Sequence, residues 1–418
     1  MKVTDLIIGA GISGLSYAAA TSNDYLIVEA DSQIGGYCKT IRQDGFIWDY
    51  SGHFFHFQHP EIKDFVMQDI RPDEMLSVRK FTQILYKNKR VDYPFQMNIH
   101  QLDKREFIDC LYDLFTIPET EKTESFKQML YAKFGKSIAE KFLIPYNTKL
   151  YAIDLDELDV DAMGRFFPFA NKDQIIKNFK NPDNASYNAA FLYPQKGCMR
   201  IVDSVCSHVD KNRICLNEKV LSVDRSNHTV RTDKRMLEYN HLISTMPLPR
   251  LFDISGVDYD KTVYSWNKVL VFNLGFDSKG PERKNNWIYV PEKKYCFYRV
   301  GFYDNILGQD RTSLYVEIGF GKDDAIGDTQ ELLQRTLQDL VHAGFITESQ
   351  QLISYHRVIM DPAYVHITQV SERDKKEKME LLKADDIYSI GRYGAWKYCS
   401  LEDNIHDAFQ LAASIYPV

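Results

Sequence analysis

The sequence predicts an α/β fold built around a Rossmann-like dinucleotide-binding domain, and three features near its start carry this prediction. Residues 6–8 are an apolar stretch that leads directly into a glycine-rich turn at residues 9–14 (GAGISG). An alanine-rich segment with helical character follows, and a second apolar stretch at residues 25–28 ends on the acid Glu29. A strand, a glycine turn, a helix and a second strand closed by an acid are the parts of the dinucleotide-binding βαβ unit.

Each glycine of the turn has a physical role. Gly9 makes the tight turn, Gly11 lets the backbone approach a pyrophosphate, and Gly14 lets the helix pack close to the strand. The free N–H groups and the dipole of the helix favour an anion at its N-terminus, beside Ser13. Glu29 is placed to accept hydrogen bonds from an adenosine ribose, and its charge would repel a 2′-phosphate there.

The residues after Glu29 favour FAD over NAD. A second glycine pair, Gly35 and Gly36, follows six residues later, and an aromatic segment then ends in DYSGHFFH. The glycine pair resembles the extended FAD-binding signature of the glutathione-reductase and amine-oxidase type of flavoprotein. Gly52 and His53 resemble the glycine–histidine loop that lies against the isoalloxazine in one branch of these proteins.

Length and composition indicate an ordinary globular protein of two or three domains. The chain has 418 residues, too many for one simple core. Its hydrophobic content of 44% and charged content of 26% are typical of globular proteins. The net charge of −7 and the lack of a basic stripe argue against nucleic acid as a partner.

The cysteines and the apolar segments indicate the cellular compartment in which the protein is expected. Seven scattered cysteines without a C-x-x-C pair predict reduced thiols in a cytoplasmic protein, with neither a disulfide framework nor a metal site. The chain begins almost at its first strand, so no signal peptide is expected. No apolar run approaches the length of about eighteen residues that a membrane span requires, so no membrane association is expected.

Hydrophobic periodicity outlines the rest of the chain. Residues 81–97 are predicted to form strands around a turn at residues 87–90, and the period becomes helical from Leu102, with Asp103 as the expected cap. The expected apolar face of this helix consists of Phe107, Ile108, Leu111, Leu114 and Phe115. The other elements are expected at residues 123–134, 137–143, 329–343 (ending at Gly344) and from about Asn404 for helices, and at residues 241–247, 269–276, 314–320 and 387–390 for strands.

These elements predict a discontinuous domain organisation. The FAD-binding domain is expected to comprise residues 1–80, 190–250 and 380–418, from both ends of the chain. A helical insertion is expected at residues 98–189. A mixed or antiparallel β-sheet substrate domain is expected from residues 81–97 and 251–379.

Several separated motifs then occur in a fixed order. Residues 93–99 are YPFQMNI, residues 145–152 are PYNTKLYA, and residues 287–292 are WIYVPE, with Arg299 ten residues after Tyr289. The segment GRYGAWKY near the end contains Arg392, and Tyr364 precedes that arginine by 28 residues. With these segments the chain resembles the UDP-galactopyranose mutase family, closer to its eukaryotic than its bacterial branch, within the amine-oxidase-like flavoproteins. The resemblance extends from residue 1 to about residue 412.

The resemblance implies a site for a nucleotide-diphosphate sugar, with UDP as the nucleotide, next to the flavin. The implied catalytic residues are His53, Arg165, Arg299 and Arg392. The implied substrate-binding residues are Tyr93, Phe95, Gln96, Asn147, Tyr151, Arg165, Asn188, Tyr289, Arg299, Tyr364 and Tyr398. The complete expected flavin site is Gly9, Gly11, Ser13, Gly14, Glu29, Gly35, Gly36, Gly52, His53, Gly391, Arg392, Asp403 and Asn404, and the sequence leaves open which of Glu402, Asp403 and Asn404 contacts the flavin.

The implied chemistry explains these residue types. A planar guanidinium binds phosphate oxygens bidentately, so Arg165 and Arg299 are expected to clamp the pyrophosphate from opposite sides. The family's activity interconverts UDP-galactopyranose and UDP-galactofuranose for cell-surface polysaccharides. In it, N5 of reduced FAD attacks the anomeric carbon while UDP leaves, and the ring recloses through another hydroxyl of the N5–sugar adduct. NADPH and NADH are candidate reductants.

Some positions depart from the family pattern. Tyr151 stands where an indole is usual, and bulky Gln195 and Lys196 precede Gly197 where the eukaryotic branch is richer in glycine. Two other functions also stay open: an FAD-dependent oxidoreductase of the amine-oxidase or protoporphyrinogen-oxidase type, which shares the flavin fold and the early motifs, and a flavin-binding protein without turnover. The sugar, the reductant and a homo-oligomeric state also stay open.

Overall fold

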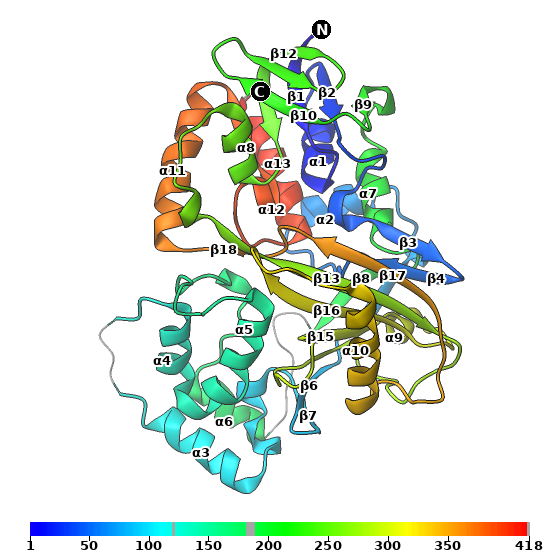
Figure 1. Cartoon of the computed structure of the whole chain (residues 1–418), viewed down its shortest axis with the longest axis vertical. Coiled ribbons are helices and arrows are strands. Elements are labelled where there is room, and N and C mark those ends of the chain that lie inside the picture. Colours follow the sequence, from blue (N-terminus) through cyan, green and yellow to red (C-terminus); the bar gives the residue numbers. More distant parts are fainter. Residues whose placement is uncertain (119–121, 181–188, 416–418) are drawn as a thin grey trace.

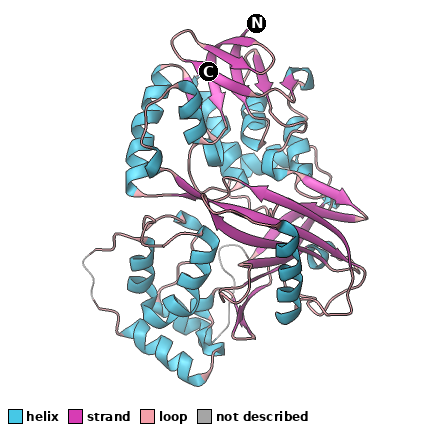
Figure 2. Cartoon of the chain, viewed as in Figure 1, coloured by secondary structure: helices cyan, strands magenta, loops and turns pink. Residues whose placement is uncertain are grey.

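The structure, a computed structural model, describes residues 1–118, 122–180 and 189–415. Within these residues it has two large sheets, one of seven and one of eight strands. Figure 1 shows the first sheet at the end where both termini lie, the second sheet across the middle, and a group of helices beside it. Figure 2 shows that strands and helices are mixed around the first sheet, whereas the helical group contains almost no strand. This is the mixed α/β architecture that the sequence predicts.

The seven-stranded sheet is the nucleotide-domain sheet, and it draws strands from three distant parts of the chain. In order its strands are β10 (Val220–Asp224), β11 (Thr229–Thr232), β12 (Met236–Ser244), β1 (Lys2–Ile8), β2 (Tyr25–Val28) and β9 (Ile214–Cys215), with β19 (Ile387–Ser389) paired to β12. The pairs β12–β1, β1–β2, β2–β9 and β12–β19 are parallel. Strands from both chain ends thus share one sheet.

Helices cover both faces of this sheet, as a doubly wound fold requires. Ile7 of β1 packs in one apolar cluster, whereas its neighbours Leu6 and Ile8 pack in another on the opposite face. The first cluster includes residues of α1 (Ile12–Ala20), α2 (Pro60–Met67), α7 (Met199–Cys206) and α13 (Leu401–Ile415). The second includes residues of α8 (Leu248–Ser255) and α11 (Gln369–Ala384).

The eight-stranded sheet is mixed. Its strands in order are β17 (Leu352–Met360), β13 (Ser265–Phe276), β16 (Ser313–Gly321), β15 (Arg299–Phe302), β14 (Trp287–Tyr289), β6 (Thr82–Tyr86) and β7 (Lys89–Asp92), with β18 (Val365–His366) paired to β13. The pairs are antiparallel except β14–β6, which is parallel. Helix α10 (Thr329–His342) packs on one face through Leu333 and Leu340.

The helical group lies between β7 and β8 in the chain. It consists of α3 (Lys104–Phe115), α4 (Phe126–Ile138), α5 (Ile144–Tyr151) and α6 (Lys172–Lys180). Smaller elements are the hairpin β3 (Thr40–Gln43)–β4 (Phe46–Asp49), the pair β5 (Met75–Arg79)–β8 (Ala190–Pro194), and the short helices α9 (Tyr303–Leu307) and α12 (Gly391–Gly394). The residue boundaries proposed for the three domains stay a prediction.

The structure corrects two expectations about α3. Asp103 holds the cap position, but its side chain makes no capping bond and instead accepts a 2.7 Å hydrogen bond from Lys89 Nζ. The expected apolar face is also wrong in part, because Ile108 is 51% and Phe115 55% exposed. Leu114 and the unexpected Cys110 are the fully buried residues, because both pack in one apolar cluster with Met129, Leu130 and Phe134 of α4.

The predicted break after Phe134 between the next two helices is confirmed, whereas the predicted start at residue 123 and end at Leu143 are wrong. Helix α4 continues to Ile138 through a break at Gly135, whose φ of +72° only glycine adopts easily. A π-helical turn at Ala139–Leu143 then leads directly into α5, which takes Pro145 in its first turn.

Other expectations are met closely. Helix α10 ends two residues before Gly344, whose φ is +70°. Helix α13 begins at Leu401, three residues earlier than expected. In the described residues no helix is long and apolar enough to cross a membrane.

One buried histidine makes folding dependent on pH. His366 is 2% exposed, its Nε2 lies 2.9 Å from the carbonyl oxygen of Tyr151, and its Nδ1 lies 3.0 Å from Oγ of Ser265. A carbonyl only accepts, so Nε2 donates and Nδ1 accepts from the hydroxyl, which is the neutral imidazole. Burial lowers the pKa of His366 from 6.5 to about 4.

We expect replacement of His366 by asparagine to flatten the acid branch of the stability curve. As the pH falls from 6.5 to 4, the unfolded chain binds a proton that the folded imidazole excludes, so the free energy of unfolding falls by about 1.4 kcal/mol for each step of one in pH. The measurement is the melting temperature between pH 7 and 4 for wild type, His366→Asn and the exposed control His342→Asn. An unchanged pH slope in His366→Asn would contradict this assignment.

Candidate functional site

The first glycine turn leaves no room for side chains at two positions. Gly9 has a φ of +100°, and a Cβ there would lie 2.3 Å from Oγ1 of Thr245. A Cβ on Gly14 would lie 2.0 Å from the carbonyl oxygen of Gly9. These contacts press the N-terminus of α1 against the ends of β1 and β12.

A third glycine contact forms a cradle of bare backbone. A Cβ on Gly11 would point at Cα of Gly36 from 4.0 Å, and a Cβ on Gly36 at Cα of Gly11 from 3.5 Å. The two glycines of the two predicted motifs therefore face each other at the N-terminus of α1. Exposed N–H groups with no side chains between them are what a pyrophosphate needs.

Glu29 lies at the end of β2, where the sequence places it. Its Oε2 accepts a 2.7 Å hydrogen bond from the backbone N–H of Ala10, and its Oε1 one of 2.8 Å from Asp31. These bonds aim the carboxylate at the outer side of the glycine turn. A carboxylate so fixed can accept ribose hydroxyls without first being ordered.

The C-terminal part of the chain closes over the same turn. Oγ of Ser13 donates to Oδ1 of Asn404 (3.1 Å), and the backbone N–H of Arg392 donates to the same oxygen (2.8 Å). Gly391, with a φ of +86°, packs so tightly that a Cβ would lie 2.5 Å from Ser13 Oγ. The structure thus brings Ser13, Gly391, Arg392 and Asn404 together.

Asn404 is therefore the residue of the three C-terminal candidates that lies at the glycine turn. Asp403 instead accepts a 2.6 Å hydrogen bond from Nη2 of Arg165. Glu402 accepts the backbone N–H groups of Gln58 and His59 at 2.7–2.9 Å. Asp403 and Glu402 tie α13 to neighbouring segments, and neither bonds to Ser13 or Arg392.

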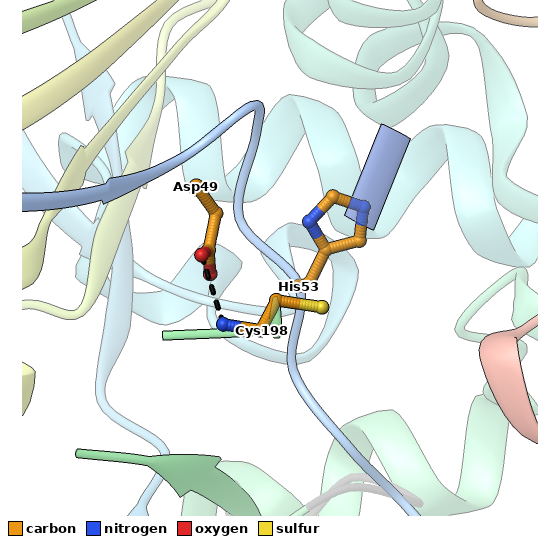
Figure 3. A group of neighbouring side chains, drawn as sticks. All are labelled: Asp49, His53 and Cys198. Atoms are coloured by element: carbon orange, nitrogen blue, oxygen red, sulfur yellow. Dashed lines mark hydrogen bonds between the residues drawn. The ribbon is translucent and has the colours of Figure 1, made fainter. Parts of the chain in front are cut away.

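His53 lies in a buried junction with Asp49 and Cys198 (Figure 3). One ligand atom of each lies within 4.8 Å of the others, a spacing that suits a metal ion. The Asp49 carboxylate, however, already accepts hydrogen bonds from Thr40 Oγ1 (2.6 Å), Tyr193 OH (2.8 Å) and the Cys198 N–H (2.9 Å). Burial also raises the pKa of Cys198 well above its ordinary value, which keeps the thiol protonated and a poor ligand.

A second group with metal-ligand spacing lies near the surface. His59, Glu61 and His406 have ligand atoms within 4.8 Å of one another. The two imidazoles stack with ring centres 4.4 Å apart and a 22° interplanar angle. The in-plane lone pairs of stacked rings run side by side, so they do not converge on one ion.

The imidazole of His53 is neutral. Burial, together with the nearby Arg392 guanidinium, lowers the pKa of His53 to about 4. Its Nδ1 is buried without a hydrogen-bond partner among the described residues. The neighbouring Gly52 packs on the second sheet, because a Cβ there would lie 2.5 Å from the hydroxyl oxygen of Tyr315.

A buried ion pair stands behind this loop. Arg299 on β15 donates from Nε (2.6 Å) and Nη2 (2.8 Å) to the carboxylate of Glu317 on β16, which is 1% exposed. Oγ of Ser51 donates to the same carboxylate. Glu317 therefore connects the glycine–histidine loop to the arginine that the sequence predicts as a phosphate ligand.

Arg392 is surrounded by tyrosine rings. Its guanidinium carbon lies 5.1 Å from the ring centre of Tyr364 and 4.7 Å from that of Tyr398, and these two rings stack 5.8 Å apart. Nη1 donates to the carbonyl of Cys399 at 3.3 Å, whereas Nε is buried without a partner among the described residues. Cation–π contacts of this kind stabilise a buried guanidinium.

A second pair of rings lies near Arg299. Tyr93 and Tyr289 have ring centres 4.7 Å apart, and the pair Tyr289–Arg299 is in register across β14 and β15. Burial raises the pKa of Tyr93 well above 10 and that of Tyr398 to about 12, so both hydroxyls remain donors at neutral pH. Six predicted residues, two arginines and four tyrosines, thus gather around the glycine–histidine loop.

Arg165 lies apart from this group of arginines and tyrosines, beside Gln58 and Asp403. Besides Asp403, its guanidinium donates to Gln58, and its carbon lies 4.9 Å from the ring centre of Phe166. A small pocket opens beside it, lined by Phe54, Phe55, His56, Phe57, Arg165, Phe166, Ser400, Leu401 and Glu402. The predicted clamp of Arg165 with Arg299 stays a prediction, because Arg165 is engaged by Asp403 in this structure.

The predicted uridine-side residues lie in the core of the helical group. Phe95 and Gln96 are 0% exposed, Tyr151 1% and Asn147 3%. Oε1 of Gln96, Oδ1 of Asn147 and the Tyr151 hydroxyl have no hydrogen-bond partner among the described residues. Unsatisfied buried polar atoms cost free energy, so these three are candidates for bonds to water or to a bound group. Asn188 lies outside the described residues.

Sequence reasoning missed Glu317, Ser51 and Gln58. A signal for Glu317 exists, because residues 314–320 alternate and this acid lies on the face opposite Leu314, Val316 and Ile318. That face is also buried, as Tyr315 shows with 0% exposure. An acid on a buried strand face needs a cation, and Arg299 is that cation.

The arrangement fits a flavin dinucleotide. Bare backbone at Gly11 and Gly36 suits the pyrophosphate, and Glu29 suits the ribose. His53 Nδ1 and Arg392 Nε are buried and unpaired among the described residues, where a flavin ring would supply partners. Beside them the guanidinium groups and tyrosine hydroxyls form a positively charged, donor-rich surface that suits a phosphate-containing ligand.

Comparison with known proteins agrees with this arrangement. The family described as flavin containing amine oxidoreductase matches residues 12–357. The structure of reduced UDP-galactopyranose mutase superposes with a TM-score of 0.91 at 21% identity, covering 99% of this chain and 95% of that one. A proposed protoporphyrinogen oxidase from Exiguobacterium sp. 255-15 gives 0.78 at 16% identity, covering 99% and 98%. At these identities the likeness shows the fold alone.

Curated relatives cover less of the chain. Protoporphyrinogen oxidase 2 of Arabidopsis thaliana is 22% identical over 255 residues, which are 52% of this chain and 49% of that protein. The chain spans less than half the length of the curated relatives it matches. The family implies a flavin cofactor, FAD.

The glycine cradle predicts how Gly11→Ala behaves. Gly11 has an ordinary φ of −76°, and the nearest atom to an added Cβ is 4.0 Å away, so the apoprotein should keep its melting temperature. The methyl group would fill the space between Gly11 and Gly36, so flavin affinity should fall. The measurement is flavin absorbance per mole of purified protein, with reconstitution by added FAD.

Gly308→Ala is the matched control for this variant. Gly308 has a φ of +66° with nothing within 4 Å, so alanine there should lower stability by about 1 kcal/mol and leave flavin binding unchanged. Full flavin occupancy in Gly11→Ala would place the pyrophosphate elsewhere.

Proposed function

The chain belongs to the family of flavin-containing amine oxidoreductases, and within it we propose a nucleotide-sugar mutase that interconverts UDP-galactopyranose and UDP-galactofuranose or a closely related pair. The observation that carries the proposal is the pairing of partly buried arginines with tyrosines beside the glycine–histidine loop. Arg299 and Arg392 are held there with Tyr289, Tyr364 and Tyr398. In a protein with a net charge of −7, two arginines gathered in one place support a site for a negatively charged diphosphate.

The bonds of Arg299 leave one edge of the guanidinium for a ligand. Nε and Nη2 are held by Glu317, and no hydrogen bond joins Nη1 to a described residue. With its plane fixed, the group can present Nη1 to a phosphate oxygen without losing side-chain freedom on binding. The proposed role of Arg299 is to bind the leaving diphosphate and hold it near the sugar.

The aromatic residues orient the rest of the substrate in this proposal. The unpaired atoms of Gln96, Asn147 and Tyr151 would accept and donate bonds to the nucleoside. The hydroxyls of Tyr289, Tyr364 and Tyr398 would complete the diphosphate site. Remote binding energy of this kind is used to position the reacting carbon.

The flavin would be held by the glycine cradle, Glu29, Gly52, His53 and Arg392. When bound in its reduced form it supplies a nucleophilic nitrogen, N5, for a reaction without net oxidation. A neutral His53, with its pKa lowered to about 4, adds no positive charge beside the ring at pH 7. The Arg392 side chain would pack against the flavin with its charge spread over the rings of Tyr364 and Tyr398.

A second candidate function is oxidation of an amine or a porphyrinogen. The curated relatives that match by sequence are named protoporphyrinogen oxidases. The partly buried arginines favour the mutase, because such substrates carry no diphosphate. Placement in the eukaryotic branch, reduction by NADPH or NADH, a cytoplasmic location, a role in cell-surface polysaccharide synthesis and a homo-oligomeric state remain parts of the proposal.

The deciding experiment uses the purified yellow protein. It is incubated with UDP-galactopyranose or UDP-galactofuranose, with and without dithionite, and the products are separated by chromatography. Interconversion only with reduced flavin supports the proposal. No conversion together with tight UDP binding points to another nucleotide sugar. Absence of UDP binding, with oxygen consumption on amines or protoporphyrinogen, would favour the oxidase.

Arg299→Lys tests the role of the guanidinium. Lysine keeps the positive charge beside Glu317, but it lacks the planar set of N–H donors with which a guanidinium can bind Glu317 and a phosphate at the same time. A charged hydrogen bond contributes about 1.5–3 kcal/mol, so kcat/KM should fall roughly ten- to hundredfold while flavin absorbance stays the same. The exposed Arg250→Lys is the control and should match wild type. Unchanged kcat/KM in Arg299→Lys would remove Arg299 from the diphosphate site.

A further inference from the structure

Lys149 on α5 has an unusual set of partners. Its Nζ lies 3.0 Å from the carbonyl oxygens of Val290 and Glu292, 3.1 Å from that of Tyr295 and 2.5 Å from that of Phe297. All four acceptors belong to the segment 290–297 that connects β14 to β15. One side chain thus holds the whole connection of this hairpin.

The four acceptors define the charge state of the lysine. A carbonyl oxygen only accepts, and an ammonium has three N–H donors, so at least one proton is shared between two oxygens. Burial lowers the pKa of Lys149 to about 8, which still leaves the ammonium charged at pH 7. The group is a cation in a cage of carbonyl dipoles, tethered to α5 by its own side chain.

The cage joins two elements that carry different parts of the proposed site. Asn147 and Tyr151, with unpaired buried polar atoms, lie on α5 on either side of Lys149 in the chain. Tyr289 and Arg299 are paired at the end of the hairpin that directly adjoins the connection held by the lysine. No other charged side chain of α5 is available for this task.

Packing around the cage makes the joint rigid. A Cβ on Gly319 of β16 would lie 2.4 Å from the carbonyl oxygen of Lys149, so the backbone of α5 rests directly on the sheet. Tyr146 of the same helix packs on Tyr289 with ring centres 5.1 Å apart, and on Tyr298 at 6.1 Å. A shift of segment 290–297 would therefore move Tyr289 and Arg299 relative to α5.

We propose that Lys149 is a positioning residue for nucleotide-diphosphate recognition: its ammonium fixes segment 290–297 on α5, which sets Arg299 and Tyr289 opposite Asn147 and Tyr151. The inference rests on the proposed function for its ligand. The residue touches neither the flavin cradle nor the glycine–histidine loop in the described structure. Its loss should weaken binding of the nucleotide more than it slows the chemical step.

The test is Lys149→Ala with chemical rescue. Alanine retains Cβ, so n-propylammonium has the length to refill the space and return a cation to the four carbonyls. We expect the KM for the UDP-sugar and the Kd for UDP to rise about tenfold or more, with kcat changed less than about threefold. Flavin absorbance should stay unchanged. Propylammonium should restore KM and Kd, whereas neutral 1-propanol should not.

A buried lysine elsewhere in the same sheet domain provides the control. Lys279 is 16% exposed and donates to Asp304 (2.5 Å), Asn305 (2.9 Å) and the carbonyl of Gln309 (3.2 Å). Lys279→Ala should lower the melting temperature and leave KM and Kd unchanged. Should Lys149→Ala not fold, Lys149→Gln keeps two donors without the charge and should show a smaller rise in KM and Kd.

Hydrogen exchange separates this inference from the proposed function. The amides of segment 290–297 should exchange faster in Lys149→Ala than in wild type, and propylammonium should reverse the change, whatever the protein binds. Unchanged exchange there, or a loss of stability with normal UDP affinity, would overturn the positioning role. A wild-type protein that binds no UDP while the exchange result holds would overturn the proposed function instead.

Discussion

The contact on which the site depends is the buried ion pair between Arg299 and Glu317. Glu317 is 1% exposed, and it also accepts a hydrogen bond from Ser51, next to the glycine–histidine loop. Removing one partner of such a pair costs about 3–5 kcal/mol, because the other charge stays buried. The pair therefore fixes the geometry between the nucleotide domain and the mixed sheet, and it orients the guanidinium for a ligand.

The nucleotide domain meets a different constraint, the close approach of backbone to backbone. Gly9, Gly14 and Gly391 have no space for a Cβ, because β1, α1 and α12 converge on one point. Strands from three regions of the chain must assemble before this point exists. Asn404 then accepts hydrogen bonds from both the Ser13 hydroxyl and the Arg392 amide, so the last helix is fixed against the first glycine turn.

The helical group is the third part of the proposed site, and both polar and apolar contacts attach it to the mixed sheet. The rings of Tyr146 and Tyr289 pack together, while Lys149 binds the carbonyls of segment 290–297. Hydrogen bonds from an ammonium to carbonyl oxygens are directional, whereas apolar contacts alone would let the helix slide along the sheet. Asn147 and Tyr151 are thereby held at a defined distance from Arg299, as recognition of a ligand that spans both elements requires.

The sequence by itself determined the α/β class, the FAD-type glycine motifs and the central strands of both large sheets, because these depend on local patterns of glycine and apolar residues. It failed at the exposed face of α3 and at the outer bounds of α4 and α5, where tertiary packing decides which residues are buried. It located the arginines and tyrosines but not their partners. Only the tertiary structure decided that Glu317 pairs with Arg299, that Asp403 engages Arg165, and that Asn404 meets the glycine turn, because charge pairing depends on distances between segments far apart in the chain.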